Sequence, residues 1–132
     1  MNEDFAPFEL AKKLKEKGFD EPCYGYYHCN GGNDSFELCG NGDRDFLNSK
    51  NRYRVAAPTI PQVLKWLRKK KKIYVSILPF ATGSTIDKVA FYYLIEYNST
   101  GETMEGIEQN TYCAELEDAA LAGIKYVLDN LV

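Results

Sequence analysis

The spacing of hydrophobic positions predicts an amphipathic helix near the start of the chain. The apolar positions of residues 5–17 recur at helical spacing, at Phe8, Ala11 and Leu14. Pro7 suits the first turn of a helix, and Gly18 suits the left-handed residue that ends one. We expect Phe19 to fold back as the apolar contact of that cap.

Two further helices are predicted from the same pattern. Thr59 and Gln62 match a capping box. One apolar face follows it, made of Ile60, Val63, Leu64 and Leu67, and we expect this helix to run to about residue 70. Residues 114–131 predict a last helix, whose first turn holds acidic residues where the helix dipole favours them.

Segments rich in aromatic and β-branched residues predict antiparallel strands between the helices. Residues 24–29 and 35–39 flank an Asn/Gly/Asp turn and predict a hairpin, and residues 52–56 predict a further short strand.

A second group of strands follows the middle helix. Residues 73–78 predict a strand that Pro79 places at a sheet edge or stops. In residues 89–97, both the odd-numbered and the even-numbered positions are mostly apolar. We therefore expect both faces of that strand to be substantially covered. Residues 102–107 predict a partner strand behind the turn at 98–101.

The predicted element order is α-β-β-(β)-α-β-β-(β)-α, which is typical of the α+β class. We expect a single compact domain over residues 1–132, with two sub-lobes at 1–57 and 58–132. No residue-level repeat relates the two parts.

Length and composition restrict the class of protein. The chain has 132 residues, of which 45% are hydrophobic and 14% aromatic, which excludes an intrinsically disordered chain. No apolar run approaches the roughly 20 residues of a membrane span. The first residues lack the basic and apolar regions of a secretory signal. We therefore expect a cytoplasmic protein with no membrane partner.

The formal net charge of −3 conceals a strong separation of charge along the chain. Residues 1–45 hold 5 basic and 10 acidic side chains, and residues 87–132 hold 2 basic and 9 acidic ones. Residues 46–86 hold 9 basic and no acidic side chains. Such a block is either exposed to solvent or neutralised by acidic residues, in the fold or across a subunit contact.

Three segments carry a resemblance to known sequences: LAKKLKEKGFDEPCYGYY at residues 10–27, APTIPQVLKWLR at 57–68 and ELEDAALAGI at 115–124. They resemble a group of functionally uncharacterised proteins from Bacteroidetes genomes and their phages or prophages. The resemblance implies a bacterial or mobile-element context and a cytoplasmic location, and it implies no catalytic residue.

A cluster of cysteine and histidine offers one candidate chemistry. Cys23, His28, Cys29 and Cys39 form a legitimate set of zinc ligands by residue type. Five residues separate the first two cysteines, which is wider than a zinc knuckle, and adjacent strand residues point to opposite faces. We favour buried thiols and expect no metal and no cofactor.

Catalysis finds little support in the sequence. The single histidine must serve any His-based triad, and no local signature surrounds it. The Gly-rich segments at 40–42 and 83–85 match no phosphate-binding loop. We assign no catalytic residue and expect the protein not to be an enzyme.

The basic segment 50–72 is the clearest functional candidate. Cations at a helix end complement the helix dipole, but five consecutive cations exceed what a cap requires. Their chemistry suits the phosphates of nucleic acid, with Tyr92, Tyr93 and Tyr97 as stacking surfaces. The candidate binding residues are Arg52, Arg54, Lys65, Arg68, Lys69, Lys70, Lys71 and Lys72.

The second half of the chain shares the element order of double-stranded-RNA-binding domains. Those domains carry lysine at the start of the last helix, where this chain has Glu115, Glu117 and Asp118. The acidic residues weaken that analogy.

These patterns predict a small non-enzymatic binding or interaction protein, whose partner is another protein or a second copy of the chain. Ten tyrosines and seven phenylalanines support an interface, although aromatic strands also build cores. The first alternative is a nucleic-acid-binding accessory protein that uses segment 50–72. The second alternative is a small enzyme or zinc protein that uses residues 23–39.

Overall fold

The computed structural model describes residues 5–28, 35–39, 46–50, 53–81, 89–97, 105–108, 113 and 115–132. The chain divides into two compact units, Met1–Gln62 and Val63–Val132, and helix α2 crosses the boundary between them. None of the described helices is long and apolar enough to cross a membrane.

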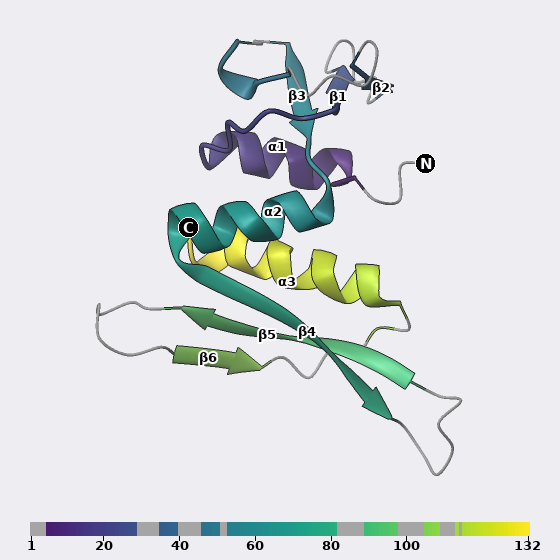
Figure 1. The fold of residues 1–132 in the computed structure, drawn as a ribbon, viewed down its shortest axis with the longest axis vertical. Coiled ribbons are helices and arrows are strands. Elements are labelled where there is room, and N and C mark those ends of the chain that lie inside the picture. Colours follow the sequence, from purple (N-terminus) through teal and green to yellow (C-terminus); the bar gives the residue numbers. More distant parts are fainter. Residues whose placement is uncertain are drawn as a thin grey trace. The chain divides into compact units, whose positions relative to one another are not determined.

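The elements confirm the α+β class and the predicted order of helices and strands (Figure 1). Unit 1 contains α1 (Phe8–Glu16), β1 (Gly25–His28), β2 (Phe36–Leu38), a 3₁₀ turn (Asn48–Lys50) and β3 (Arg54–Ala57). Helix α2 (Ile60–Trp66) leads into the π-helical segment η5 (Leu67–Lys71). Unit 2 continues with β4 (Ile73–Ala81), β5 (Val89–Tyr97), β6 (Glu105–Glu108) and α3 (Leu116–Asn130).

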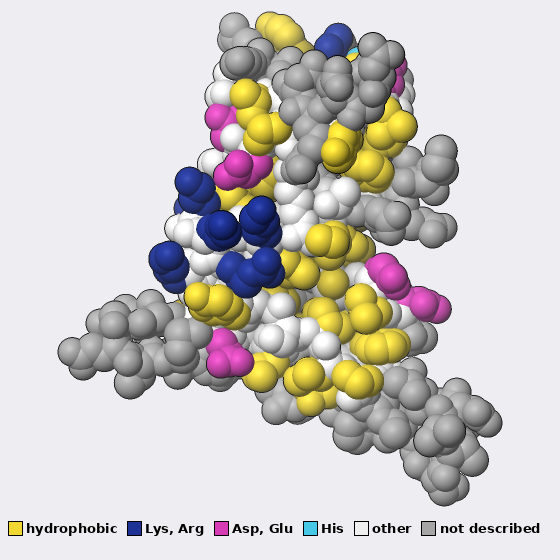
Figure 2. Space-filling model, in the orientation of Figure 1, with side chains coloured by type: hydrophobic (Ala, Val, Ile, Leu, Met, Phe, Trp, Pro, Cys, Tyr) yellow, Lys and Arg dark blue, Asp and Glu magenta, His cyan; other side chains and the backbone are white. Residues whose placement is uncertain are grey.

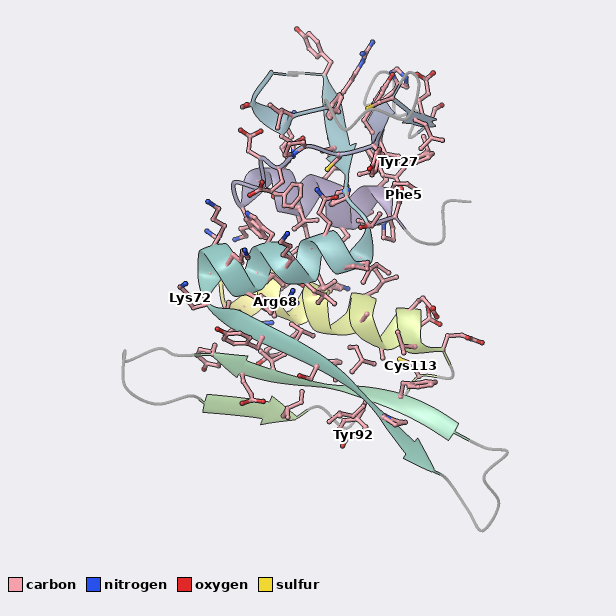
Figure 3. All side chains as sticks on the ribbon, in the orientation of Figure 1. Phe5, Tyr27, Arg68, Lys72, Tyr92 and Cys113 are labelled. Carbon is pink, nitrogen blue, oxygen red and sulfur yellow. The ribbon has the colours of Figure 1, made fainter. Side chains whose placement is uncertain are left out.

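Unit 1 is an antiparallel sheet, in the order β2-β1-β3, packed against α1. The predicted hairpin is confirmed by the pairing of Tyr26 with Glu37. Its core joins the two layers through Ala11, Tyr27, Val55 and Ala57, with Phe5, Phe8 and Phe36 packed around them. The buried Tyr27 hydroxyl donates a hydrogen bond to the carbonyl of Ala6 at 2.7 Å, so burial leaves no unpaired polar group there (Figure 3).

Helix α1 ends as its sequence predicts. Gly18 has a φ of 93°, a conformation that residues with a Cβ rarely adopt. The N–H of Phe19 donates to the carbonyl of Leu14 at 2.9 Å, and the Phe19 side chain is only 1% exposed. These bonds form a Schellman cap with its apolar contact.

Helix α2 begins with one half of the predicted capping box. The Thr59 hydroxyl accepts a hydrogen bond from the Gln62 N–H at 3.3 Å. The Gln62 side chain instead donates to the carbonyl of Pro22 at 2.7 Å and accepts from the Cys23 thiol at 3.7 Å. The Gln62 amide therefore bonds to the connection between α1 and β1 rather than to the start of its own helix.

The end of this helix differs from the regular α-helix predicted to residue 70. Residues Leu67–Lys71 form a π-helical turn, and Lys72 ends it with a φ of 58°, its N–H bonded to the carbonyl of Leu67. Like charges one turn apart disfavour a regular helix. Buried Trp66 and Ile73 hold the two ends of this wider turn.

Unit 2 is an antiparallel sheet, in the order β4-β5-β6, with α3 packed on β4 and β5 (Figure 1). Pro79 predicts that its strand either lies at a sheet edge or stops there. Strand β4 does lie at the edge of the sheet, and it continues through Pro79 to Ala81. An edge strand accommodates proline because its missing N–H need not join a ladder.

Helix α3 covers one face of this sheet closely. Tyr93 and Ile95 are 5% and 0% exposed. A Cβ on Gly123 would lie 2.9 Å from Val75 Cγ1 and 3.1 Å from Tyr93 Cγ, so only glycine permits this approach. On the opposite face of β5, Tyr92, Leu94 and Glu96 are partly buried, in line with the prediction that both faces of this strand are substantially covered.

Candidate nucleic-acid interface

Five consecutive cations, Arg68–Lys72, form the feature that we call the basic turn. All five side chains are exposed, whereas Trp66, Leu67 and Ile73 on either side are buried. The buried residues anchor the backbone, so the cations project from a fixed base. Figure 2 shows Lys and Arg side chains gathered over the end of α2, and Figure 3 labels Arg68 and Lys72 in this region.

The basic turn is not neutralised within the part of the chain that the structure describes. No salt bridge there joins a carboxylate to the basic turn or to Lys65. The ammonium of Lys71 lies 5.5 Å from the centre of the Trp66 ring, within the range of a cation–π contact. The electrostatic potential of the turn is therefore available to an anionic ligand.

The structure brings together six of the eight predicted binding residues. Lys65 is exposed at the end of α2, in the same unit as the basic turn. Arg54 belongs to unit 1, where its guanidinium lies 5.2 Å from the centre of the Tyr26 ring. Arg52 lies outside the described residues. The site that the structure supports is thus Lys65 with the basic turn.

Unit 2 carries opposite charges at the two ends of its sheet. The basic turn precedes Ile73, while the exposed Glu115, Glu117 and Asp118 begin α3. Phe91 pairs with Pro79 and bridges to Cys113, which places the start of α3 near the far end of β4. At about 3.3 Å per residue, the six steps from Ile73 to Pro79 separate these ends by roughly 20 Å. The acidic end would repel phosphate where double-stranded-RNA-binding domains bind it.

The tyrosines predicted as stacking surfaces do not share one face. Tyr93 lies under α3, 6.5 Å from the Tyr126 ring, and burial raises the pKa of its hydroxyl. Tyr97 alternates onto the same side of β5 as Tyr93. Tyr92 lies on the side away from α3 (Figure 3). The proposed role of Tyr93 is therefore wrong, because a covered ring cannot stack on a base.

Sequence reasoning missed the residues that accompany Tyr92. The register pairs Leu78 with Tyr92, Ser76 with Leu94 and Tyr74 with Glu96. Alternation places these six side chains on the side of the sheet opposite α3, which we call the open face. Tyr74 is 40% exposed there. The alternation of side chains along a strand shows from sequence which residues share a face. Which of the two faces α3 covers is known only from the structure.

The described members of the cysteine and histidine cluster have other partners. The Cys39 thiol donates to the carbonyl of Cys23 at 3.4 Å, and His28 Nε2 lies 3.2 Å from Glu37 Oε2. Across the described ranges, no group of three potential ligands is placed to hold a metal, and Cys29 lies outside them.

The Tyr26 hydroxyl donates to the same Glu37 oxygen at 2.8 Å. This hydrogen bond lowers the pKa of Glu37, with a further hydrogen bond from His28, and it raises the pKa of Tyr26. The three groups form a hydrogen-bonded network on the surface of unit 1.

A shallow depression of about 270 Å³ lies between the end of α1 and the 3₁₀ turn. Its buried polar residue is Asn48, whose amide donates to the carbonyl of Phe19 at 2.8 Å and accepts from the N–H of Ala56 at 2.9 Å. Both ends of this side chain serve the fold, so the depression offers no unsatisfied buried group to a ligand.

Comparison with known proteins finds no matching family model, curated protein or solved structure.

Proposed function

We propose that the protein is a non-enzymatic binding protein and that its ligand is nucleic acid, held through the phosphate backbone by Lys65 and the basic turn. The observation that carries this proposal is the exposure of five consecutive cations with no carboxylate partner among the described residues.

The physical support is electrostatic. A phosphate chain carries closely spaced charges, and cations that neutralise them release condensed counterions, which drives binding. The overall pI of about 5.2 does not oppose this, because the acidic side chains of unit 2 that begin α3 lie at the other end of the sheet. A local basic surface on an acidic protein also restricts the ligand to one region.

The test is fluorescence binding to single- and double-stranded DNA and RNA over a salt series. We expect Lys69→Glu/Lys71→Glu to abolish most binding at about 50 mM salt, since two cations become two anions and the charge at the site falls by four units. Lys12→Glu/Lys125→Glu, on exposed helix positions elsewhere, changes net charge equally and should bind much more like the wild type. No wild-type binding, or equal losses in the two variants, would contradict the proposal.

The separated charges of unit 2 favour a second candidate, self-association. A basic end and an acidic end, roughly 20 Å apart, allow one copy to present its basic turn to Glu115, Glu117 and Asp118 of another. Light scattering over the same salt series tests this: a dimer that dissociates as salt rises supports it, and a monomer at every salt concentration excludes it.

A further inference from the structure

The open face of the unit 2 sheet lies directly beside the basic turn. Lys72 ends the turn, and Tyr74 follows two residues later on β4, or about 7 Å along the strand. Four residues beyond Tyr74, Leu78 pairs with Tyr92 on the neighbouring strand. A path from the cations across the open face therefore meets one tyrosine and then a second.

The chemistry of this face suits flat, partly polar ligands. Tyr74 is 40% exposed and Tyr92 is partly exposed, and both belong to strands of the sheet. Leu78 and Leu94 provide apolar surface between them. Tyrosines fixed on a sheet next to cations are the combination by which proteins stack unpaired bases and hold the connecting phosphates.

The carboxylate of Glu96 disfavours the binding of a purely apolar partner to the open face. It pairs with Tyr74 on the open face, so an apolar partner, or the same face of a second copy, would bury a carboxylate beside the tyrosine. A single strand can follow the tyrosines while leaving the carboxylate in water. A duplex keeps its bases stacked on each other and cannot use the rings.

We infer that the open face binds single-stranded nucleic acid, with unpaired bases stacked on Tyr74 and Tyr92 and the adjoining phosphates held by the basic turn. This inference rests on the proposed function. Glu96 limits the affinity, since its carboxylate lies beside Tyr74 on the same face and repels nearby phosphates.

The experiment uses a fluorescein-labelled oligothymidine and a duplex of equal length as probes. Tyr74→Leu and Tyr92→Leu should each weaken oligothymidine binding about 5- to 100-fold and leave duplex binding nearly unchanged. Tyr74→Phe should bind like the wild type, because stacking needs the ring and not the hydroxyl. Tyr53→Leu, at an exposed tyrosine of unit 1, is the matched control. Glu96→Gln should bind the oligothymidine more tightly.

Three outcomes distinguish the inference of base stacking on the open face from the proposed function on which it rests. If neither probe binds the wild type, the proposed function fails and the inference with it. If both probes bind and Lys69→Glu/Lys71→Glu weakens them, but folded Tyr74→Leu and Tyr92→Leu bind oligothymidine as the wild type does, only the inference fails. If those tyrosine substitutions instead dissolve a dimer without weakening oligothymidine binding, the open face is a subunit contact and the inference is wrong.

Discussion

Individual side chains of unit 1 show how a surface network shifts proton binding. Glu37 accepts hydrogen bonds from Tyr26 and His28 on neighbouring positions of β1. These donors favour the charged carboxylate, which lowers the pKa of Glu37. A carboxyl with a lowered folded-state pKa contributes stability above its unfolded pKa, and that contribution is lost as the pH falls through the folded value.

Tyr26→Phe tests the network at the residue scale. Removing the hydroxyl deletes the largest cause of the shift, so we expect the pKa of Glu37 to rise toward its ordinary value while His28 still holds it partly down. Less stability should then be lost on acidification through this group, and that smaller loss should be complete at a higher pH than in the wild type. Carbon-detected NMR of the glutamate carboxyl measures the pKa directly, and Tyr74→Phe, in the other unit, is the control. An unchanged Glu37 pKa in Tyr26→Phe would contradict this interpretation.

At the scale of elements, the basic turn depends on one left-handed residue. Lys72 has a φ of 58°, which costs a residue with a Cβ roughly 1–2 kcal/mol and a β-branched residue more. Lys72→Gly should therefore be at least as stable as the wild type, and Lys72→Val should be less stable by about 1–2 kcal/mol. Urea unfolding measures the difference, and equal stability of the two variants would show that Lys72 does not hold this conformation in solution.

The contact between α3 and the sheet depends on a missing side chain. A Cβ on Gly123 would meet Val75 at 2.9 Å, and valine is too stiff to yield easily. We expect Gly123→Val to lower the free energy of unfolding by about 1–3 kcal/mol through overpacking. Ala122→Val, one position along the same helix and only partly buried, controls for β-branching in a helix. Equal losses in the two variants would exclude close packing as the cause.

Elements whose ends are fixed by residues close in sequence could be predicted from the sequence. Which side chains from different strands share a face of the sheet could not. Gly18 and Thr59 fix their helix ends by bonds within a few residues, so the pattern locates them correctly. The π-helical turn lies between Trp66 and Ile73, whose burial is a property of the folded unit that the sequence pattern does not give. Similarly, the residue types of the basic turn identify it in sequence and Tyr74 follows it directly, but Tyr92 joins them only through the register of β4 with β5.

For the whole molecule, net charge is a poor guide to binding. The sum of −3 contains a span of 41 residues, 46–86, with 9 basic and no acidic side chains. The structure exposes the densest part of that span and separates it from the acids that begin α3. Ionic strength should therefore act on binding through a few localised cations rather than through the whole surface.

The most direct measurement is the salt dependence of oligothymidine affinity for the wild type and for Lys69→Glu/Lys71→Glu. Each neutralised phosphate of a single strand adds about −0.7 to the slope of log K against log salt, so Lys65 and the five cations of the basic turn predict a slope of up to about −4.2. The variant should bind weakly and show a slope smaller in magnitude by at least about 1.4. Wild-type affinity that does not change with salt, or the same slope in both proteins, would contradict a phosphate-binding role for the basic turn.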